Sequence, residues 1–276
     1  MNATVAVGFS PSRTSLSAAE WAAEEAARRG LALRLVHAGG VRPHSWPNPT
    51  AALGEEVAGR LGDRHPGLVV HVDEVFGPPA EVLATAAESA ELLVLGSRGL
   101  GGVTGALLRS VSQATVARAT GPVVVVREGA RDRPPGDVVL GLDLAHPCDE
   151  LLDFAFHAAT GHAGRLRVVY AWQPPSFLTR NPQEPAPDLY AEVLPRQARA
   201  LSDALAPWRH KYPEVTVAER VLTGHAPHHL TQAAAGAALL VVGRRPRRSS
   251  AGPRVGHTLH ALLHHSPAPV AVVPHP

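Results

Sequence analysis

Short apolar runs alternate with longer helical patterns along the first half of the chain. The runs have strand length and fall at residues 4–9, 31–38, 68–75, 92–95 and 123–126. Helical patterns separate them at residues 18–23, 78–89 and 110–119, and two arginines and a glycine at 28–30 end the first helix. Strands that are apolar throughout and alternate with helices indicate a parallel sheet covered on both faces. The pattern therefore predicts a doubly wound α/β domain.

The second half of the chain repeats this plan. Val36 lies 133 residues before Val169 in a matching triplet, whereas Gly96 lies 147 residues before Gly243. The offset grows by 14, so the second copy carries a longer central insertion. Its strands are expected at residues 138–142, 166–171, 215–221, 239–242 and 270–273.

A charged stretch rich in proline and glycine separates the two copies. Because it has no periodicity, we expect a first domain at residues 1–128, a linker at 129–136 and a second domain at 137–276. Two proline-rich connections, 39–50 and 172–188, follow the second strand of each copy and contain Trp46 and Trp172. They are either ligand-contacting segments at the carboxyl edge of the sheet or surface loops.

Composition narrows the class of protein further. Of the 276 residues, 45% are hydrophobic and 18% are charged, which supports two buried cores and excludes a wholly disordered chain. The formal net charge of +2 does not predict nucleic-acid binding. The single cysteine, Cys148, excludes an internal disulfide, and we expect a buried or half-buried small residue there. Without an apolar run of about 18 residues or a leader pattern, we expect a soluble, cytoplasmic protein that makes no membrane contact.

The chain contains one lysine, Lys211, beside a tyrosine and a proline in a polar stretch. The phosphate loop that ends in Gly-Lys-Ser/Thr is therefore absent, and a lysine Schiff base is disfavoured. Any bound nucleotide must be held by backbone amides or by arginine.

A glycine-rich segment at residues 95–112 follows a buried strand and precedes the helix expected from Ser110. Glycines let the backbone approach a ligand closely, and the start of a helix offers unpaired amides and a positive dipole end. Together they suit an anion such as phosphate. The alternative is a plain glycine turn in which Ser110 caps the helix.

This order of elements and glycines resembles the universal stress protein family. The family pattern is Gly-x2-Gly-x9-Gly-Ser/Thr after the fourth strand, and here Gly96 and Gly99 match while Arg109-Ser110 stands at its end. The flanking segments 77–83 and 121–126 are also typical of the family. The resemblance covers both copies. It implies two tandem doubly wound α/β domains, each a five-stranded parallel sheet flanked by helices, with a Rossmann-like architecture.

The resemblance also implies a site in the first copy. In nucleotide-binding members, loop amides and a Ser/Thr hold phosphates, while a first-strand Asp and second-strand backbone hold the nucleoside. Here the first-strand position is Ser10, which has no carboxylate. Arg109 and its neighbour Arg98 either crowd the loop, bind phosphate or stay solvated. The positions carried over are Ser10, Ala38, Gly96, Arg98, Gly99, Arg109, Ser110 and Val111.

The second copy departs from the family pattern in the complementary way. Asp143 keeps the carboxylate, and the spacing from Gly243 to Gly256 survives. Pro246, however, stands where the family has glycine and His257 where it has Ser/Thr, so the loop has fewer amide donors. Arginines at 244, 245, 247 and 248 either attract phosphate or keep the surface soluble. We therefore expect the retained site in the first copy.

The function that the resemblance implies is a stress-response sensor or regulator that binds an adenine nucleotide, namely ATP with or without Mg²⁺. Slow ATP hydrolysis at most is expected, because no catalytic base is evident. The alternatives are an interaction scaffold that binds no nucleotide, and a nucleotide-transferring enzyme. The resemblance also implies pairing through the last strands, at 123–126 and 270–273, either in a homodimer or within the chain.

Two further groups of polar residues are interpreted without a ligand. His257, His260 and His264 share a helical face without a carboxylate, so no tightly bound metal is expected. Glu24 and Glu25 are expected to be an exposed helix pair with the arginines at 28 and 29 as partners.

Overall fold

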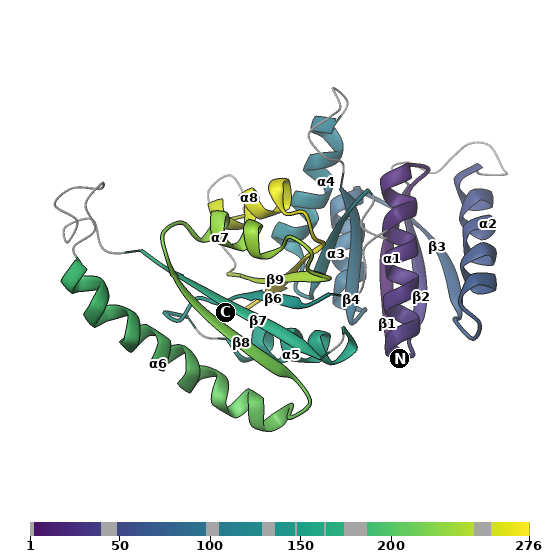
Figure 1. Cartoon of the computed structure of the whole chain (residues 1–276). Coiled ribbons are helices and arrows are strands. Elements are labelled where there is room, and N and C mark those ends of the chain that lie inside the picture. Colours follow the sequence, from purple (N-terminus) through teal and green to yellow (C-terminus); the bar gives the residue numbers. More distant parts are fainter. Residues whose placement is uncertain are drawn as a thin grey trace.

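The strands of both copies form one continuous ten-stranded sheet in the computed structural model (Figure 1). The strand order is β3-β2-β1-β4-β5-β10-β9-β6-β7-β8. The structure describes residues 3–39, 49–97, 105–128, 136–146, 148–162, 164–173, 187–245 and 255–275.

The first half of the molecule contains the elements up to β5. They are β1 (Thr4–Phe9), α1 (Arg13–Arg29), β2 (Ala32–Gly39), α2 (Pro49–Arg64), β3 (Val70–Phe76), α3 (Pro79–Glu88), β4 (Leu92–Ser97), α4 (Gly105–Arg118) and β5 (Val123–Arg127). All neighbouring strands within this half are parallel. The predicted α/β class and strand positions of the first half are therefore confirmed.

The second half repeats the same order with parallel neighbours. Its elements are β6 (Val138–Gly141), α5 (Asp149–Gly161), β7 (Arg165–Trp172), α6 (Pro187–Lys211), β8 (Thr216–Thr223), α7 (Ala226–Ala233), β9 (Leu239–Arg244), α8 (His257–His265) and β10 (Val270–Pro274). The longer insertion includes α6, which has 25 residues where α2 has 16. Trp172 ends β7 rather than lying in a connection, and Trp46 lies outside the described residues.

The two halves meet where β5 pairs with β10 in the antiparallel sense, Val270 opposite Val125 and Val272 opposite Val123. The last strands therefore pair within the chain, which is one of the two arrangements that the sequence left open. Both sides of β5 and of β10 are hydrogen-bonded in this sheet, and β3 and β8 form its outer edges.

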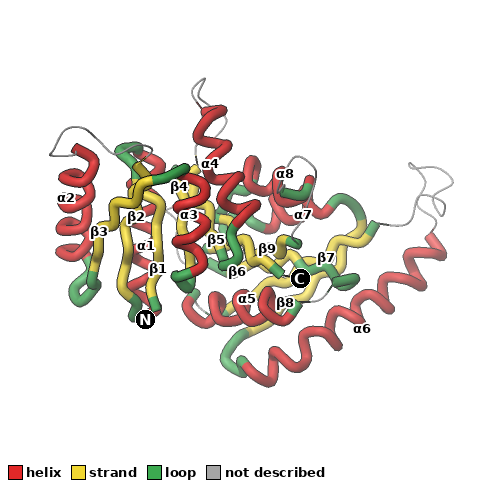
Figure 2. The backbone as a smooth tube through the Cα atoms, turned by 180° about the vertical axis from the view of Figure 1, so that it is seen from behind, coloured by secondary structure: helices red, strands yellow, loops and turns green. Residues whose placement is uncertain are grey.

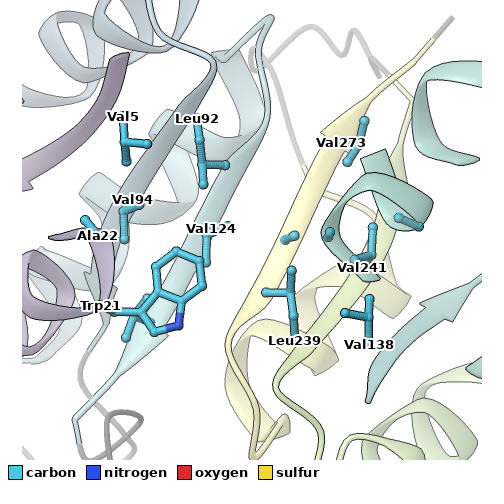
Figure 3. Close-up of a cluster of buried hydrophobic side chains, with 14 of the residues drawn as sticks. Val5, Trp21, Ala22, Leu92, Val94, Val124, Val138, Leu239, Val241 and Val273 are labelled. Atoms are coloured by element: carbon cyan, nitrogen blue, oxygen red, sulfur yellow. The ribbon is translucent and has the colours of Figure 1, made fainter. Parts of the chain in front are cut away.

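The helices cover the two faces of the sheet in separate sets (Figure 2). One buried cluster takes side chains from α1, α2, α5 and α6, and the other from α3, α4, α7 and α8. In β1, Val5 and Val7 belong to the first cluster and Ala6 to the second, as the alternation of side chains along a strand requires. Trp21 of α1 lies over the sheet near Val124, close to the boundary between the halves (Figure 3). Among the described residues, no helix is long and apolar enough to cross a membrane.

The start of α1 packs unusually closely on β4. Ser12 caps the helix by accepting a hydrogen bond from the Ser15 amide at 3.3 Å. A Cβ atom at Gly96 would lie only 2.5 Å from the Thr14 carbonyl oxygen, which belongs to the backbone and cannot rotate away. The glycine at this position is thus required by the packing of α1 on the sheet.

Glu25 joins the two halves instead of lying exposed, so the prediction of an exposed pair was wrong for this residue. Its side chain is 3% exposed and bonds Arg28 and Arg29, the latter at 2.6 Å. His162, which follows α5 in the second half, lies 3.5 Å from the same carboxylate. Side chains at the carboxyl end of α1 contact α5 and the residue after it, with Arg29 over the Phe154 ring at 5.8 Å. Glu25, which helical spacing predicts to be exposed, is therefore buried.

The environment of Glu25 holds this carboxyl in its charged form. Burial alone would raise its pKa, but the hydrogen bond to His162 and the charges of Arg29 and Arg28 outweigh that effect and lower the pKa to about 2. The folded value lies below the ordinary value of 4.5. The resulting stabilisation is therefore complete above pH 4.5 and is lost as the pH falls towards 2.

We predict that Glu25→Gln lowers the free energy of unfolding at pH 7 by about 3 kcal/mol, because two arginines lose their buried counter-charge. The difference from the wild type should shrink as the pH falls from 4.5 towards 2. Urea denaturation across this pH range measures both effects. Glu55→Gln, at an exposed position of α2, serves as the control and should change stability by less than about 0.5 kcal/mol. Equal stability of Glu25→Gln and wild type at pH 7 would contradict the prediction.

We further predict that Gly96→Ala destabilises the fold by about 2 kcal/mol, because the new methyl group forces α1 away from β4. Gly59→Ala is the matched control, since a Cβ atom there meets nothing within 4 Å in the exposed middle of α2. That control should stabilise the protein by up to about 1 kcal/mol, as alanine favours helix. Denaturant titration of both variants measures the change in the free energy of unfolding, which should fall for Gly96→Ala and rise for Gly59→Ala.

Candidate functional site

The first half contains a cavity of about 240 Å³ at the carboxyl ends of its central strands. We call it the first cavity. Its wall includes residues at the ends of β1, β2 and β4, and residues of α1, α3 and α4. In the sheet, β2 and β3 lie on one side of β1, and β4 and β5 lie on the other. The chain changes sides between β3 and β4, so the cavity lies at the switch point of the strand order. Open α/β sheets bind their ligands at this place.

A group of hydroxyls forms the side of the first cavity nearest α1. The Ser10 amide donates to Ser15 Oγ at 2.8 Å, and Ser15 Oγ donates to the Gly8 carbonyl at 3.2 Å. Ser10 Oγ lies 3.2 Å from Ser12 Oγ, which in turn lies 3.3 Å from Thr14 Oγ1. These neutral groups occupy the position at which the family pattern has a carboxylate.

The described lining of the first cavity carries little charge. It contains no aspartate, glutamate, lysine or arginine, and its ionisable side chains are His37 and His264. His37 Nδ1 lies 3.1 Å from the Phe9 carbonyl oxygen and is held by that contact. The floor is apolar, with Leu83, Leu95 and other aliphatic side chains. Such a cavity presents no fixed negative charge to repel an anion.

Ser97, at the end of β4, adds an unsatisfied group to this wall. Its Oγ atom is buried and has no hydrogen-bond partner among the described residues. By contrast, the hydroxyl of Ser112, which also lines this cavity from α4, has a partner: its Oγ donates to the Gly96 carbonyl at 3.2 Å. A buried hydroxyl without a partner is costly, so a bound molecule that supplies one is favoured here.

Four of the predicted site residues come together in the first cavity, namely Ser10, Ala38, Gly96 and Val111. Arg98 and Gly99 lie outside the described residues. For Arg109 and Ser110 the structure describes only the backbone, within α4.

The expectation that helix α4 begins near Ser110 was wrong. The helix begins at Gly105, and the segment Gly-Ala-Leu-Leu that opens it contains strong helix formers. The Ser110 amide therefore lies beyond the first turn, inside the helical hydrogen-bond ladder. The amides that α4 leaves unpaired belong to residues 105–107 instead.

A second cavity, of about 450 Å³, lies at the corresponding strand ends of the second half. It brings together the predicted residues Asp143, Gly243 and Gly256. The Asp143 carboxylate is largely exposed and accepts hydrogen bonds from the Ala145 amide and from His146 Nδ1, both at 3.1 Å. Gly256 precedes α8, and no side chain caps that helix.

The protein itself fills the space beside Gly243 in the second cavity. A Cβ atom at this glycine would lie 2.6 Å from His275 Nε2, so the imidazole ring lies against the backbone. The His275 amide donates to the Arg244 carbonyl at 3.0 Å and holds this segment in place. The ring narrows the approach to Gly243, which still lines the second cavity.

The side chain of Arg244 makes its hydrogen bonds to the first half of the protein. The residue is buried, and its guanidinium donates to the Ala119 carbonyl and, at 3.2 Å, to the Ala117 carbonyl at the end of α4. Burial lowers its pKa from the usual value. Cations at a helix carboxyl end are stabilised by the helix dipole. Neither of the two readings left open for the four arginines, phosphate attraction or a soluble surface, fits the buried Arg244. Arg245 is exposed and lines the second cavity, and Arg247 and Arg248 lie outside the described residues.

Several lining residues of the first cavity escaped prediction. The hydroxyls at residues 12, 14 and 15, beside the predicted Ser10, were a local signal, because they follow a buried strand and start a helix. Ser97 directly follows a predicted site glycine. Gln113 and His264 gave no such signal, since the fold brings them together from different halves; their side-chain nitrogens lie 2.9 Å apart.

His260, His264 and Cys148 have partners within the protein. His260 and His264 contact each other with ring centroids 4.4 Å apart, and the described residues contain no cluster of three His, Cys, Asp or Glu that could hold a metal ion. Cys148 is buried, as predicted, and donates to Glu150 Oε2 at 2.9 Å; burial raises its pKa.

Comparisons with known proteins agree with this architecture. The model of the universal stress protein family matches residues 1–127 and 136–274. Universal stress proteins of Mycobacterium bovis and Mycobacterium tuberculosis are 31% identical to this chain over 291 residues, covering 97% of it and 96% of their own length. A universal stress protein structure from Archaeoglobus fulgidus shares the fold, with a TM-score of 0.69 at 16% identity over 98% of both chains. The chain therefore belongs to the universal stress protein family and carries two of its domains in tandem.

Proposed function

We propose that this protein binds an adenine nucleotide, ATP, in the first cavity and acts in the cytoplasm as a sensor or regulator of the stress response. One observation carries the proposal. A cavity with an apolar floor and hydroxyl-rich sides lies at the switch point of the first half, and its described lining has no acidic side chain. Ligand sites typically combine an apolar surface with a few polar groups in this way.

The two kinds of lining suit the two ends of a nucleotide. Aliphatic side chains such as Leu83 and Leu95 suit the base. The hydroxyls of Ser12 and Ser97 suit ribose or phosphate oxygens. The first turn of α4, at residues 105–107, follows the glycine-rich segment, and a helix start of this kind is expected to offer amides to an anion. Magnesium, if it accompanies ATP, would be held by the phosphates and water, because the described lining offers no carboxylate.

A regulatory role is favoured over a catalytic one. Attack on a phosphate needs a group that activates the nucleophile and charges that stabilise the transition state. The described wall of the first cavity has no carboxylate or lysine for these tasks, and His37 is engaged with the Phe9 carbonyl. Slow hydrolysis at most is expected.

The second cavity is proposed as the weaker or vacated site. His275 lies against the backbone of Gly243, and Arg244 is engaged with the end of α4. Asp143 keeps the family carboxylate, but its partners there are a backbone amide and His146.

An interaction scaffold without nucleotide is the second candidate function. It is favoured by the packing role of Gly96, because this glycine would be retained beside Thr14 whether or not a ligand binds. Mass spectrometry of the gently purified native protein separates the two candidates. Nucleotide retained at one molecule per chain supports the first, and ligand-free protein that also fails to bind added ATP supports the scaffold.

We predict that Val111→Trp weakens ATP binding at least about tenfold, because the indole would fill much of a cavity of about 240 Å³. Thr258→Trp is the matched control, since Thr258 occupies the equivalent position of α8 in the second cavity. It should change affinity less than about twofold. Equilibrium dialysis with labelled ATP measures both affinities, and thermal unfolding checks that each variant folds. Wild-type affinity in Val111→Trp would remove the first cavity as the binding site.

A further inference from the structure

His37, near the end of β2, lines the first cavity with a ring whose proton position is set by the sheet. It lies opposite Phe9 of β1 in the parallel register, and its Nδ1 atom lies 3.1 Å from the Phe9 carbonyl oxygen. Because a carbonyl oxygen can only accept a hydrogen bond, Nδ1 carries the proton in this contact. In the neutral ring, Nε2 then keeps its lone pair and acts as an acceptor.

The Nε2 atom of His37 is left for a ligand. Among the residues that the structure describes, the Phe9 carbonyl is the one hydrogen-bond partner of this side chain. The described lining contains no carboxylate, so an imidazole nitrogen is the most basic acceptor that its side chains offer. The other imidazole of the lining, His264, is engaged with Gln113 of α4.

The strand order places His37 at the nucleoside end of the proposed ligand. In the sheet, β1 separates β2 from β4. The glycine-rich segment and the start of α4, where the phosphates are proposed to bind, follow β4. His37 therefore lies across β1 from the phosphate end, on the side of Ser10 and Ala38. A nitrogen in this place meets the nucleoside and not the phosphates, which is consistent with slow hydrolysis at most.

The second half has the opposite pair of residues at the equivalent positions. Tyr170 corresponds to His37 in the matching triplets, and Asp143 corresponds to Ser10. Tyr170 and Asp143 both line the second cavity, and burial together with the Asp143 charge raises the pKa of Tyr170, as expected for neighbouring groups. The strong acceptor thus follows the first strand in one half and lies on the second strand in the other.

We propose that His37 Nε2 accepts a hydrogen bond from a ribose hydroxyl of the bound nucleotide and so replaces the carboxylate that is missing at Ser10. This inference rests on the proposed function. A ribose hydroxyl can donate to a nitrogen while it accepts from a serine hydroxyl, so it matches a wall that combines His37 with Ser10 and Ser12. His37 is then a specificity-determining residue, which favours ribonucleotides over deoxyribonucleotides.

The test compares labelled ATP, 2′-deoxy-ATP and 3′-deoxy-ATP by equilibrium dialysis with the full-length protein. His37→Phe, which keeps a ring but neither nitrogen, should weaken ATP binding about fivefold, since one hydrogen bond is lost. It should leave the binding of one deoxy analogue unchanged, because that analogue already lacks the donor. His37→Gln, whose amide oxygen can accept, should recover part of the loss.

His71→Phe is the matched control. His71 is exposed on the neighbouring strand β3 and does not line the first cavity, so this variant should bind ATP within about twofold of the wild type. Thermal unfolding checks that each variant folds.

The outcomes separate this inference from the proposed function. If Val111→Trp weakens ATP binding while His37→Phe behaves as His71→Phe, the nucleotide site stands and the role of His37 is refuted. A His37→Phe variant that weakens ATP and both deoxy analogues equally also refutes the ribose contact. If the wild type binds no ATP, the inference and the proposed function fall together.

A measurement on the wild type covers the case in which His37→Phe fails to fold. The wild type should bind one of the two deoxy analogues about fivefold more weakly than ATP, because Nε2 loses its donor. Equal affinities for ATP and both analogues would overturn the inference.

Discussion

The antiparallel pairing of β5 with β10 is the contact on which the rest of the arrangement depends. The last strand of a parallel half-sheet leaves a row of backbone N–H and C=O groups unpaired, and an apolar strand in that position invites association. Here each last strand covers the other, with Val270 opposite Val125, so both rows are satisfied within one chain. The pairing also decides that α8 lies beside α4, and therefore which residues of the second half reach the first cavity.

Buried charges make this junction specific as well as apolar. Arg244 leaves β9 and bonds the end of α4, while Arg127 leaves β5 and bonds the end of α8, so each half supplies a cation to a helix of the other. Glu25 adds a third charged contact where α1 meets α5. The hydrophobic effect is not directional, whereas a buried charge that loses its partner costs several kcal/mol. These hydrogen bonds and ion pairs therefore fix the relative position of the two halves.

The fold was more predictable from sequence than the site. The expected ends of all ten strands lie within two residues of those in the structure. The central strands, buried on both faces, are local apolar runs, whereas the edge strands β3 and β8 mix apolar and polar residues. Glu25 was misread because helical spacing reports its neighbours within α1 and not the second half of the protein. The start of α4 was missed because the glycines before Gly105 suggested a longer loop. His264 could not be assigned to the first cavity, since only the pairing of β5 with β10 brings it there.

The two cavities occupy equivalent places in the two halves, but their lining residues differ in charge and in how closely they pack. Ser10 in the first corresponds to Asp143 in the second, so one has neutral hydroxyls where the other keeps a negative charge. His275 lies against Gly243 in the second cavity, whereas Ser97 in the first has a buried hydroxyl without a partner among the described residues. A tandem chain can diverge in this way because its two sites are no longer bound to be identical, as they are in a symmetric dimer. The lining of each cavity can then change independently of the other.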